Sequence, residues 1–474
     1  MDRLLQVINC LKPQEIQVIK DFFKKDAGTH GKRKQLLNIL LQKNINDDVQ
    51  AALLIYNKKP DSAYFHLKRR LLDDILNLLV LYSFDDSCES SELNAELNCT
   101  KLLMQAKLLI SRGISKEARI LLKKAYLLAE DFEIIDVKIK IKDILANNVH
   151  LSIDNASPSL NVEISKDLAT MKQLLSAEKN ILNFSFAKAD NLSCVRNLEK
   201  IRKTYKRTGS KKIEYCYYLG KITYDTFYKR FDTAYNSGLK LLNLLECNPI
   251  LKNRANQITV YLEVGKILMR LHRYKEAKIY LIKAGDITGR GMKNETEILE
   301  ALFFAYFRNE EYHNAEKLLN SVMSDKRICA DATTMARWKY FHANLLFSRG
   351  LYKESLNTLN YAGFKKEQQG WLIGNKIMEL LNIIELKDYE WFEFKIESFR
   401  KVLTSLKYKE SARYLTSYQL FKYLYKTQFN FNLTLTHESD SFSKLRDGQD
   451  NYYWDPMCHE VIKMDNWFSS KLVN

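Results

Sequence analysis

A pattern of large and small residues at fixed spacings recurs through the second half of the chain. In its clearest copy a small residue follows a large one after four positions, and another large residue comes next. A short turn leads into a second half, which opens on an aromatic residue and has a small residue three positions later. The positions are Tyr261, Gly265, Leu268, Tyr274, Ala277, Leu281 and Ala284. Helical spacing on both sides of a turn predicts two antiparallel helices.

Further copies of this order lie on both sides of the first. The downstream copies are Leu299, Phe303, Tyr306, Tyr312, Ala315, Leu319 and Val322, then Lys339, Ala343, Leu346, Tyr352, Ser355, Leu359 and Ala362, and more loosely Leu380, Ile383, Tyr389, Phe392, Ile396 and Phe399. The upstream copies are Phe231 with Ala234, and Leu102, Ala106, Leu109, Ala118, Leu122 and Ala125. The anchor positions Ala234, Ala277, Ala315, Ser355 and Phe392 are 43, 38, 40 and 37 residues apart.

A helix pair of this kind cannot bury its apolar face alone, so consecutive pairs must stack on one another. The small residues let two helices approach closely, and the large ones fill the space between neighbouring pairs. The scarcity of turn residues agrees with this, because the 474 residues include only 15 glycines and 5 prolines, where average usage gives roughly 33 and 24. The sequence therefore predicts an all-α fold of long helices with short links.

These residues resemble the tetratricopeptide repeat (TPR) motif. The resemblance is strong over 255–365, moderate over 212–254 and 366–405, and weak over 95–211; a standard unit has about 34 residues, so these units are longer. It implies an α-solenoid, a right-handed superhelix of TPR-like helix pairs in which the first helix of each pair lines a concave groove. It also implies that the protein binds peptides or protein segments and is not an enzyme. The whole layout looks like that of uncharacterised bacterial TPR-containing proteins, which indicates no particular function.

Four parts are expected along the chain: an N-terminal basic helical domain at 1–84, degenerate helical repeats at 95–211, TPR-like repeats at 212–405 and a C-terminal helical cap at 406–474. In the first part we expect helices over 13–25 and 62–83, with a boundary at the acidic, serine-rich stretch 85–92. In the last part we expect a helix over 409–428, a loop over 436–450, and a final helix that begins at Pro456.

A cytoplasmic location is expected from the cysteines and from the N-terminus. The eight cysteines are scattered and no two have metal-ligand spacing, which favours reduced, buried thiols. The N-terminus lacks the apolar run of a signal peptide. The most apolar stretch, 71–82, contains Asp73, Asp74 and Asn77 and is too short and polar to span a membrane.

Positive charge gathers in one run. The net charge is +17, which favours an acidic partner, although a basic solvated surface explains it equally well. The run at 200–212 has seven basic residues, no acidic ones and one tyrosine, so it could bind phosphates and stack a base, or simply be a solvated helix end. We assign an anionic-partner patch to Lys200, Arg202, Lys203, Tyr205, Lys206, Arg207, Lys211 and Lys212.

No catalytic or metal-binding motif stands out. Cys458, His459 and Glu460 are consecutive, but the second histidine of a zinc-protease helix is absent because Lys463 takes its place. The eight histidines do not cluster. The sequence therefore predicts no catalytic residue, no metal and no cofactor.

The leading hypothesis is a protein- or peptide-binding scaffold that uses its groove. First-helix residues beside the small packing positions are the candidates for gripping a peptide: Lys266, Arg270, Phe304, Tyr340 and Asn344. These residues could equally line an empty groove or contact the next helix. The alternative is a nucleic-acid-associated or peptide-sensing regulatory TPR protein that uses its basic patches. The identity of the partner and the oligomeric state are not encoded in any recognisable pattern.

Overall fold

Every regular element in the described part of the chain is a helix. The computed structural model describes residues 3–11, 13–25, 31–41, 47–82, 91–148, 157–186, 191–289, 294–365, 368–405 and 412–472. The chain divides into two units, one of residues 1–175 with 248–253 and one of residues 176–247 with 254–474. The all-α fold predicted from the repeat is confirmed.

The N-terminal helices of the first unit share one apolar core. They are α1 (Arg3–Cys10), α2 (Pro13–Lys25), α3 (Gly31–Leu41), α4 (Asp48–Tyr56) and α5 (Ser62–Tyr82). Leu4, Phe23, Leu36 and Leu71 are buried together in this core. The helices expected over 13–25 and 62–83 are present, whereas most of the boundary expected at 85–92 lies outside the described residues.

The rest of the first unit has its own core. It comprises α6 (Ser91–Ser111), α7 (Ser115–Asp131), α8 (Ile135–Asn147), the first part of α9 (Ser157–Phe186) and the short η2 (Pro249–Leu251). The small residues Ala106, Ala118 and Ala125 are fully buried between α6 and α7, as the repeat pattern predicts. Lys142 on α8 is paired with Asp167 on α9 at 2.7 Å.

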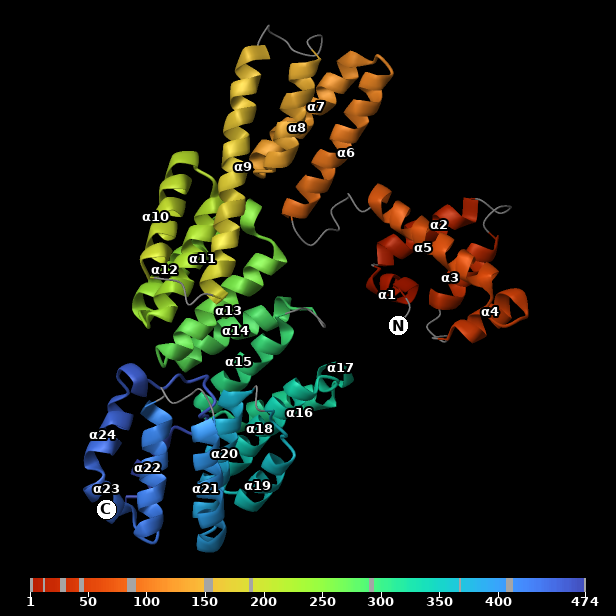
Figure 1. Cartoon of the computed structure of the whole chain (residues 1–474). Coiled ribbons are helices and arrows are strands. Elements are labelled where there is room, and N and C mark those ends of the chain that lie inside the picture. The colour runs from red at the N-terminus through yellow and green to blue at the C-terminus, as the bar shows by residue number, and fades with distance from the viewer. Residues whose placement is uncertain are drawn as a thin grey trace. The chain divides into compact units, whose positions relative to one another are not determined.

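The second unit continues with α10 (Asn191–Thr208) and then stacks helix pairs (Figure 1). The pairs are α11 (Lys211–Phe227) with α12 (Phe231–Cys247), α13 (Arg254–Arg270) with α14 (Tyr274–Ile287), α15 (Glu295–Arg308) with α16 (Tyr312–Ser324), α18 (Ala332–Ser348) with α19 (Tyr352–Asn360), and α20 (Gln369–Glu385) with α21 (Tyr389–Ser405). The short α17 (Lys326–Cys329) precedes α18. Each pair also packs on the next, so the second unit is an α-solenoid.

The same turn joins the two helices of every pair. A residue with positive φ lies two positions before the aromatic residue that begins the second helix, at Lys229, His272, Glu310, Gly350 and Lys387. The next backbone N–H donates to a carbonyl five residues earlier, as from Arg273 to Leu268 at 2.9 Å. This is a Schellman motif, which satisfies the last carbonyls of the first helix. Since only one of the five residues is glycine, the turns fit the glycine-poor composition.

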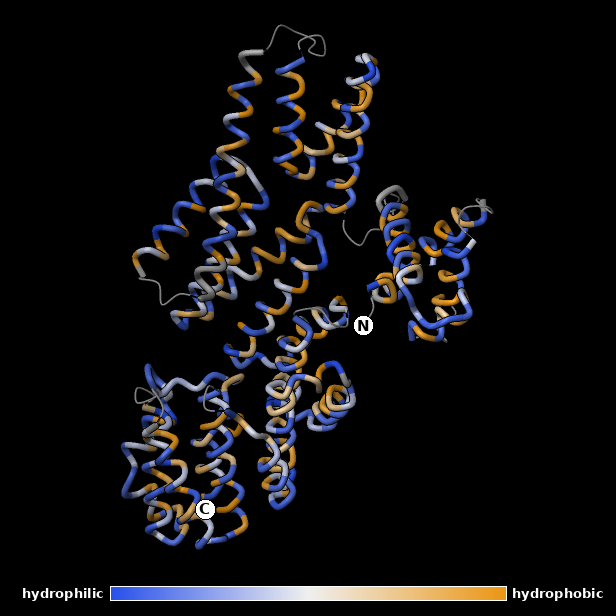
Figure 2. The backbone as a smooth tube through the Cα atoms, turned by 45° about the vertical axis from the view of Figure 1, so that its right-hand side comes forward, coloured by the Kyte–Doolittle hydropathy of each residue, from blue (hydrophilic) through white to orange (hydrophobic). Residues whose placement is uncertain are grey.

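The anchor positions occupy equivalent places in the solenoid. Ala234, Ala277, Ala315, Ser355 and Phe392 are each the fourth residue of a second helix, and none is exposed to solvent. A Cβ on Gly265 would lie 2.7 Å from the Leu281 side chain, so α13 and α14 can approach this closely only with glycine there. Hydrophobic residues recur along each helix between hydrophilic ones (Figure 2), as stacked amphipathic helices require.

The C-terminal part differs from expectation in two places. It contains α22 (Ala412–Lys426), α23 (Phe431–His437), α24 (Ser439–Asp447), η4 (Asp450–Tyr452) and α25 (Met464–Ser470). The loop expected over 436–450 is wrong, because α24 buries Phe442 and Leu445 and ends at Gly448 in the left-handed conformation. The helix expected from Pro456 is also wrong: residues 453–463 are irregular, and the final helix begins at Met464.

Candidate binding groove on the first helices

The segment 450–463, which we call the strap, begins with η4, is irregular from 453 on, and packs across the first helices of the second unit. Its N-terminal end lies at the turn between α11 and α12, where the Lys229 ammonium donates to the Asp450 carbonyl at 2.7 Å. The same ammonium lies 4.6 Å from the ring centre of Tyr453. The strap then passes α13, α15, α18 and α20 before α25 begins.

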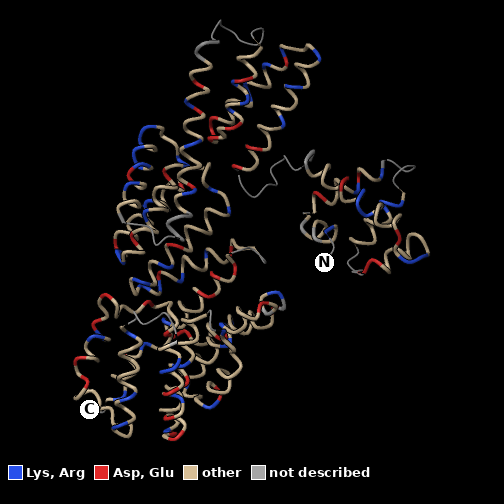
Figure 3. The backbone as a smooth tube through the Cα atoms, viewed as in Figure 1, with Lys and Arg blue, Asp and Glu red and all other residues tan. Residues whose placement is uncertain are grey.

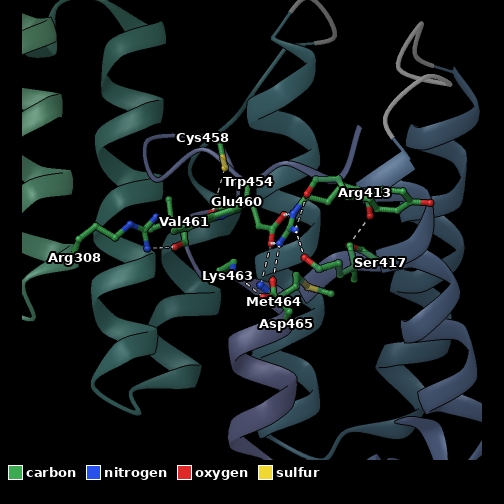
Figure 4. Close-up of polar contacts among 12 residues, drawn as sticks. Arg308, Arg413, Ser417, Trp454, Cys458, Glu460, Val461, Lys463, Met464 and Asp465 are labelled. Atoms are coloured by element: carbon green, nitrogen blue, oxygen red, sulfur yellow. Dashed lines mark hydrogen bonds and ion pairs between the residues drawn. The ribbon is translucent and has the colours of Figure 1, made fainter. Parts of the chain in front are cut away.

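Two side chains of the first helices hold the main chain of the strap. The Arg308 guanidinium, at the end of α15, donates to the Pro456 carbonyl at 2.8 and 3.0 Å and to the Val461 carbonyl at 2.6 Å (Figure 4). The Tyr340 hydroxyl on α18 donates to the His459 carbonyl at 2.6 Å. These donors satisfy carbonyls that an irregular segment cannot satisfy by itself.

Two glycines of α20 make room for the strap. A Cβ on Gly374 would overlap the His459 carbonyl and would lie 2.8 Å from the Tyr340 hydroxyl oxygen. A Cβ on Gly370 would overlap the His459 ring. That ring packs edge-on against Trp371, with 4.4 Å between ring centres. The beginning of α20 is therefore shaped to accept a main chain at close range.

Ion pairs hold the middle and the C-terminal part of the strap. Arg270 at the end of α13 donates to the Asp455 carboxylate at 2.8 Å. Arg413 on α22 is buried and pairs with Glu460 at 2.6 and 2.7 Å and with Asp465 at 2.9 Å (Figure 4). Removing one partner of such a buried network leaves an uncompensated charge, so this network stabilises the strap in its place.

Burial keeps the Cys458 and His459 side chains in their neutral forms. Burial raises the pKa of the Cys458 thiol to about 12 and lowers the pKa of His459 to about 4, so at neutral pH the thiol is protonated and the imidazole neutral. A reactive cysteine needs the opposite shift. Within the described ranges, no three His, Cys, Asp or Glu side chains are grouped as a metal site would require.

A hollow of about 350 Å³ remains open beside the strap. Its lining comes from α11, α13, α15, α20 and the strap, and comprises Thr223, Thr226, Glu263, Lys266, Arg270, Glu297, Glu300, Ala301, Phe304, Trp371 and Met457. Lys266 pairs with Glu263 and Glu297. Burial raises the pKa of Glu300 to about 7, with Arg337 opposing the shift and Glu297 adding to it. We call this space the hollow.

A second space, of about 500 Å³, is lined by the other edge of the strap. Its lining includes His272 and Tyr274 from the turn before α14, with Trp454 and Lys463 from the strap. The His272 and Trp454 rings are stacked there, and burial lowers the pKa of His272. This space has no cluster of carboxylates comparable with that of the hollow.

The five groove candidates lie on first helices, as their positions in the repeat predict. Lys266 and Phe304 line the hollow. Arg270 lines it too but is held by the strap, as is Tyr340. Asn344 is fully buried and donates to the Tyr340 carbonyl at 2.8 Å. Binding of a partner by these residues stays a prediction, and Lys266 and Phe304 are the two that line the hollow without a hydrogen bond or ion pair to the described residues of the strap.

The basic run covers the end of α10 and the start of α11, where lysine and arginine gather (Figure 3). Lys200, Lys203, Lys206 and Arg207 are exposed. Arg202 is paired with Glu199 and Lys211 with Glu214, while Lys212 is half-buried. The Tyr205 ring packs against Tyr217 at 5.3 Å between centres, so one of its sides is already covered.

The strap and the carboxylates of the hollow were missed by sequence reasoning. Cys458, His459 and Glu460 were considered only as a metal motif, and Glu263, Glu297 and Glu300 have no motif at all. The available signal for the hollow was their position on first helices, beside Lys266 and Phe304. The sequence signal for the strap was weaker: in Asp455-Pro456, the proline disfavours a helical conformation at the residue before it.

Two solved structures resemble this chain weakly. The apo form of RapI is 14% identical, covers 66% of this chain and 87% of its own, and has a TM-score of 0.47. A signal-transduction ATPase with numerous domains (STAND) protein with a tetratricopeptide repeat sensor, from Pyrococcus horikoshii, is 15% identical, covers 92% of this chain and 54% of its own, and has a TM-score of 0.28. No family model and no curated protein matches the sequence. At these scores neither likeness adds to the argument from geometry.

Proposed function

We infer that this chain is a non-catalytic repeat protein that binds a peptide or an irregular segment of another protein on the first helices of its second unit. The observation that carries this proposal is the strap. The same surface already holds a non-helical segment through donors aimed at main-chain carbonyls and through an ion pair to a side chain. A surface that binds one irregular segment in this way has the chemistry to bind another beside it.

The hollow is where a partner would enter. The strap contacts α15, α18 and α20 at Arg308, Tyr340 and Gly374. The hollow, in contrast, is open and lies where α11, α13 and α15 contribute polar and aromatic side chains. A space of about 350 Å³ is within the range of ligand pockets and accommodates one or two side chains of a bound peptide. The mechanism is anchoring of side chains in the hollow, next to a strap that fixes its wall.

A selection of random linear peptides displayed against the immobilised full chain tests this function. We expect a defined peptide to be enriched and to bind in solution, and we expect Thr223→Arg to weaken that binding at least tenfold by filling the hollow. Thr259→Arg is the matched control. Both threonines are half-buried and bond to the carbonyl four residues earlier, but Thr259 does not line the hollow.

Retention of peptide binding in Thr223→Arg at the level of Thr259→Arg would place the binding surface elsewhere. Failure to enrich any peptide that binds in solution would contradict the proposed function itself. None of the helices in the described ranges combines the length and the apolarity that a membrane span needs.

A further inference from the structure

The charged groups of the hollow do not balance. Three carboxylates line it, from Glu263, Glu297 and Glu300, together with the two cations Lys266 and Arg270. Two of the lining residues also have an ion-pair partner outside the lining: Asp455 pairs with Arg270, and Arg337 pairs with Glu300. The whole set therefore has four carboxyl groups and three cations, so ionisation of all four carboxyl groups leaves one negative charge without a counterpart within the set.

Glu300 is the carboxylate whose negative charge is least compensated by a cation. Lys266 is shared by Glu263 and Glu297, and Arg270 is taken by Asp455. Among the described residues, Arg337 is the cation paired with Glu300, and its Nη1 donates to Oε2 at 3.3 Å. Although this Nη1 also lies 3.0 Å from Oε1, Oε1 is buried and accepts no hydrogen bond from any described residue. A buried carboxylate oxygen in this state is costly.

Thr226 gives a second, independent sign of a missing donor. Its hydroxyl is buried at the end of α11, lines the same hollow and has no hydrogen-bond partner among the described residues. Two residues that line the hollow from different helices therefore each have a buried oxygen atom that accepts no hydrogen bond from the described residues. A group with several N–H donors and a positive charge would satisfy both and supply the missing cation.

The rest of the lining fits the stem and flat face of such a group. Phe304 and Trp371 provide aromatic rings, and Met457 of the strap provides a polarisable apolar contact. Cationic side chains, arginine above all, pack on aromatic faces while their nitrogens reach carboxylates. We propose that the hollow binds a cationic side chain, arginine or lysine, of the partner segment, with Glu300 as its counterion. This inference rests on the proposed function.

The proposal has a defined pH dependence. The titratable and charged groups around Glu300 are Glu263, Lys266 and Arg270 on α13, Glu297 on its own helix and Arg337 on α18. Of these, Glu297 raises the pKa of Glu300 and Arg337 lowers it. A bound cation favours the ionised carboxylate, so binding lowers the pKa of Glu300 from about 7 and releases a proton. Affinity therefore rises as the pH increases from 6 to 8, and this rise disappears in Glu300→Gln.

Two small probes test the site without needing the natural partner. N-acetyl-arginine methylamide carries the guanidinium, and N-acetyl-citrulline methylamide has the same shape without the charge. Ligand-observed saturation-transfer NMR with the full chain measures both, because it detects weak binding to a large protein. We expect the arginine probe to bind, the citrulline probe to bind at least tenfold more weakly, and Glu300→Gln to weaken the arginine probe about tenfold, the loss of one charge-assisted contact.

Control variants distinguish the loss of the binding site from a general disturbance of the fold. Thr259→Arg should leave binding of the arginine probe unchanged, and Thr223→Arg should abolish it. Because Glu300→Gln also affects Arg337, Glu297→Gln at the exposed rim provides a second variant, which should weaken binding by a few-fold. Equal binding of the two probes, or arginine binding that is unchanged in both glutamine variants, would overturn the proposal.

These outcomes are distinguishable from a failure of the proposed function. If selected peptides bind in the hollow but contain no required basic residue, the function stands and the assignment of a cation falls. If the arginine probe binds as expected while no peptide does, the site exists and the peptide-binding function falls.

Discussion

At the scale of single residues, the shape of the groove depends on which side chains are absent as much as on which are present. Gly370 and Gly374 lie one turn apart on α20, and both face the strap at His459. Glycine in a helix costs up to about 1 kcal/mol relative to alanine. Here that cost permits the main chain of the strap to reach the Tyr340 hydroxyl. Helical propensity is therefore sacrificed where another segment must approach.

Substitution of Gly374 by alanine should be destabilising, even though alanine is the better helix former. The new Cβ would overlap the His459 carbonyl, which is backbone and cannot swing away like the end of a flexible side chain. We expect a loss of roughly 1–3 kcal/mol in the free energy of unfolding and faster proteolysis within the strap. Urea denaturation measures the first effect, and limited chymotrypsin digestion, which cleaves after Tyr452, Tyr453 and Trp454 of the strap, measures the second.

Gly285→Ala is the matched control for that substitution. Gly285 also lies in a helix, α14, but a Cβ there would meet Leu302 and Ile298 at the ordinary distances of 3.7 and 3.8 Å. We expect this variant to be as stable as the parent or slightly more so. Equal stability of the two alanine variants would show that the strap does not depend on the close approach at Gly374.

At the scale of elements, the helix pairs were predictable because their signal is local. Each pair contains its own order of large and small residues, and Ala277 or Ala315 is buried by helices that are neighbours in the sequence. The turns were less visible, because Lys229, His272, Glu310 and Lys387 adopt the left-handed conformation without being glycine. The pattern of the flanking helices, rather than the turn residue itself, is what predicts the turn.

The strap was not predictable, since its partners are distant in the sequence. A proline followed by MCHEVIK is compatible with a helix start, and a helix would have used the carbonyls of 456–461 internally. In the structure Arg308 and Tyr340 donate hydrogen bonds to three of those carbonyls. The two donors lie 119 to 153 residues away from the carbonyls in the sequence. For the hollow likewise, the repeat identified Lys266 and Phe304, but the surplus carboxylate became visible only when α13, α15 and α18 were placed together.

The element with the strongest charge, α10, has one apolar and one basic side. Cys194, Leu198 and Ile201 are buried, and the opposite side presents exposed lysines. Phosphate binding by this side stays a prediction. If it occurs, it should lack base preference, because contacts to phosphates carry no sequence information.

Charge reversal on α10 tests that prediction. In a gel shift with single-stranded RNA at low salt, we expect weak retardation that disappears near 0.2 M salt and in the triple variant Lys203→Glu, Lys206→Glu, Arg207→Glu. The control variant Lys116→Glu, Lys123→Glu, Lys124→Glu changes the net charge equally on exposed positions of α7 and should behave like the parent. Absence of any retardation in the parent would remove the nucleic-acid alternative.

At the scale of the whole molecule, the strap changes how the second unit holds together. In a solenoid each pair contacts only its neighbours, so stability is a sum of local terms and parts can open separately. The strap connects α13, α15, α18 and α22 to one segment, with bonded residues up to 221 positions apart at Lys229 and Asp450. Such long-range contacts should make these pairs open as one cooperative unit.

Loosening the strap should therefore divide that unit. We choose the double variant Arg308→Met, Tyr340→Phe, which removes the donors to the carbonyls at 456, 459 and 461 while preserving most of the buried volume. Hydrogen exchange followed by mass spectrometry should show one shared slow opening for α13 to α22 in the parent. In the variant, peptides from α13 and α15 should exchange well before those from α22, and the urea m-value should fall because less surface is exposed in each step.

The double variant Arg349→Met, Tyr361→Phe is the control. It makes the same chemical changes at exposed positions, where Arg349 is paired with Glu316, and should keep the single opening. Exchange that remains uniform from α13 to α22 after Arg308 and Tyr340 are replaced would mean that neighbour packing alone, without the strap, makes the solenoid cooperative.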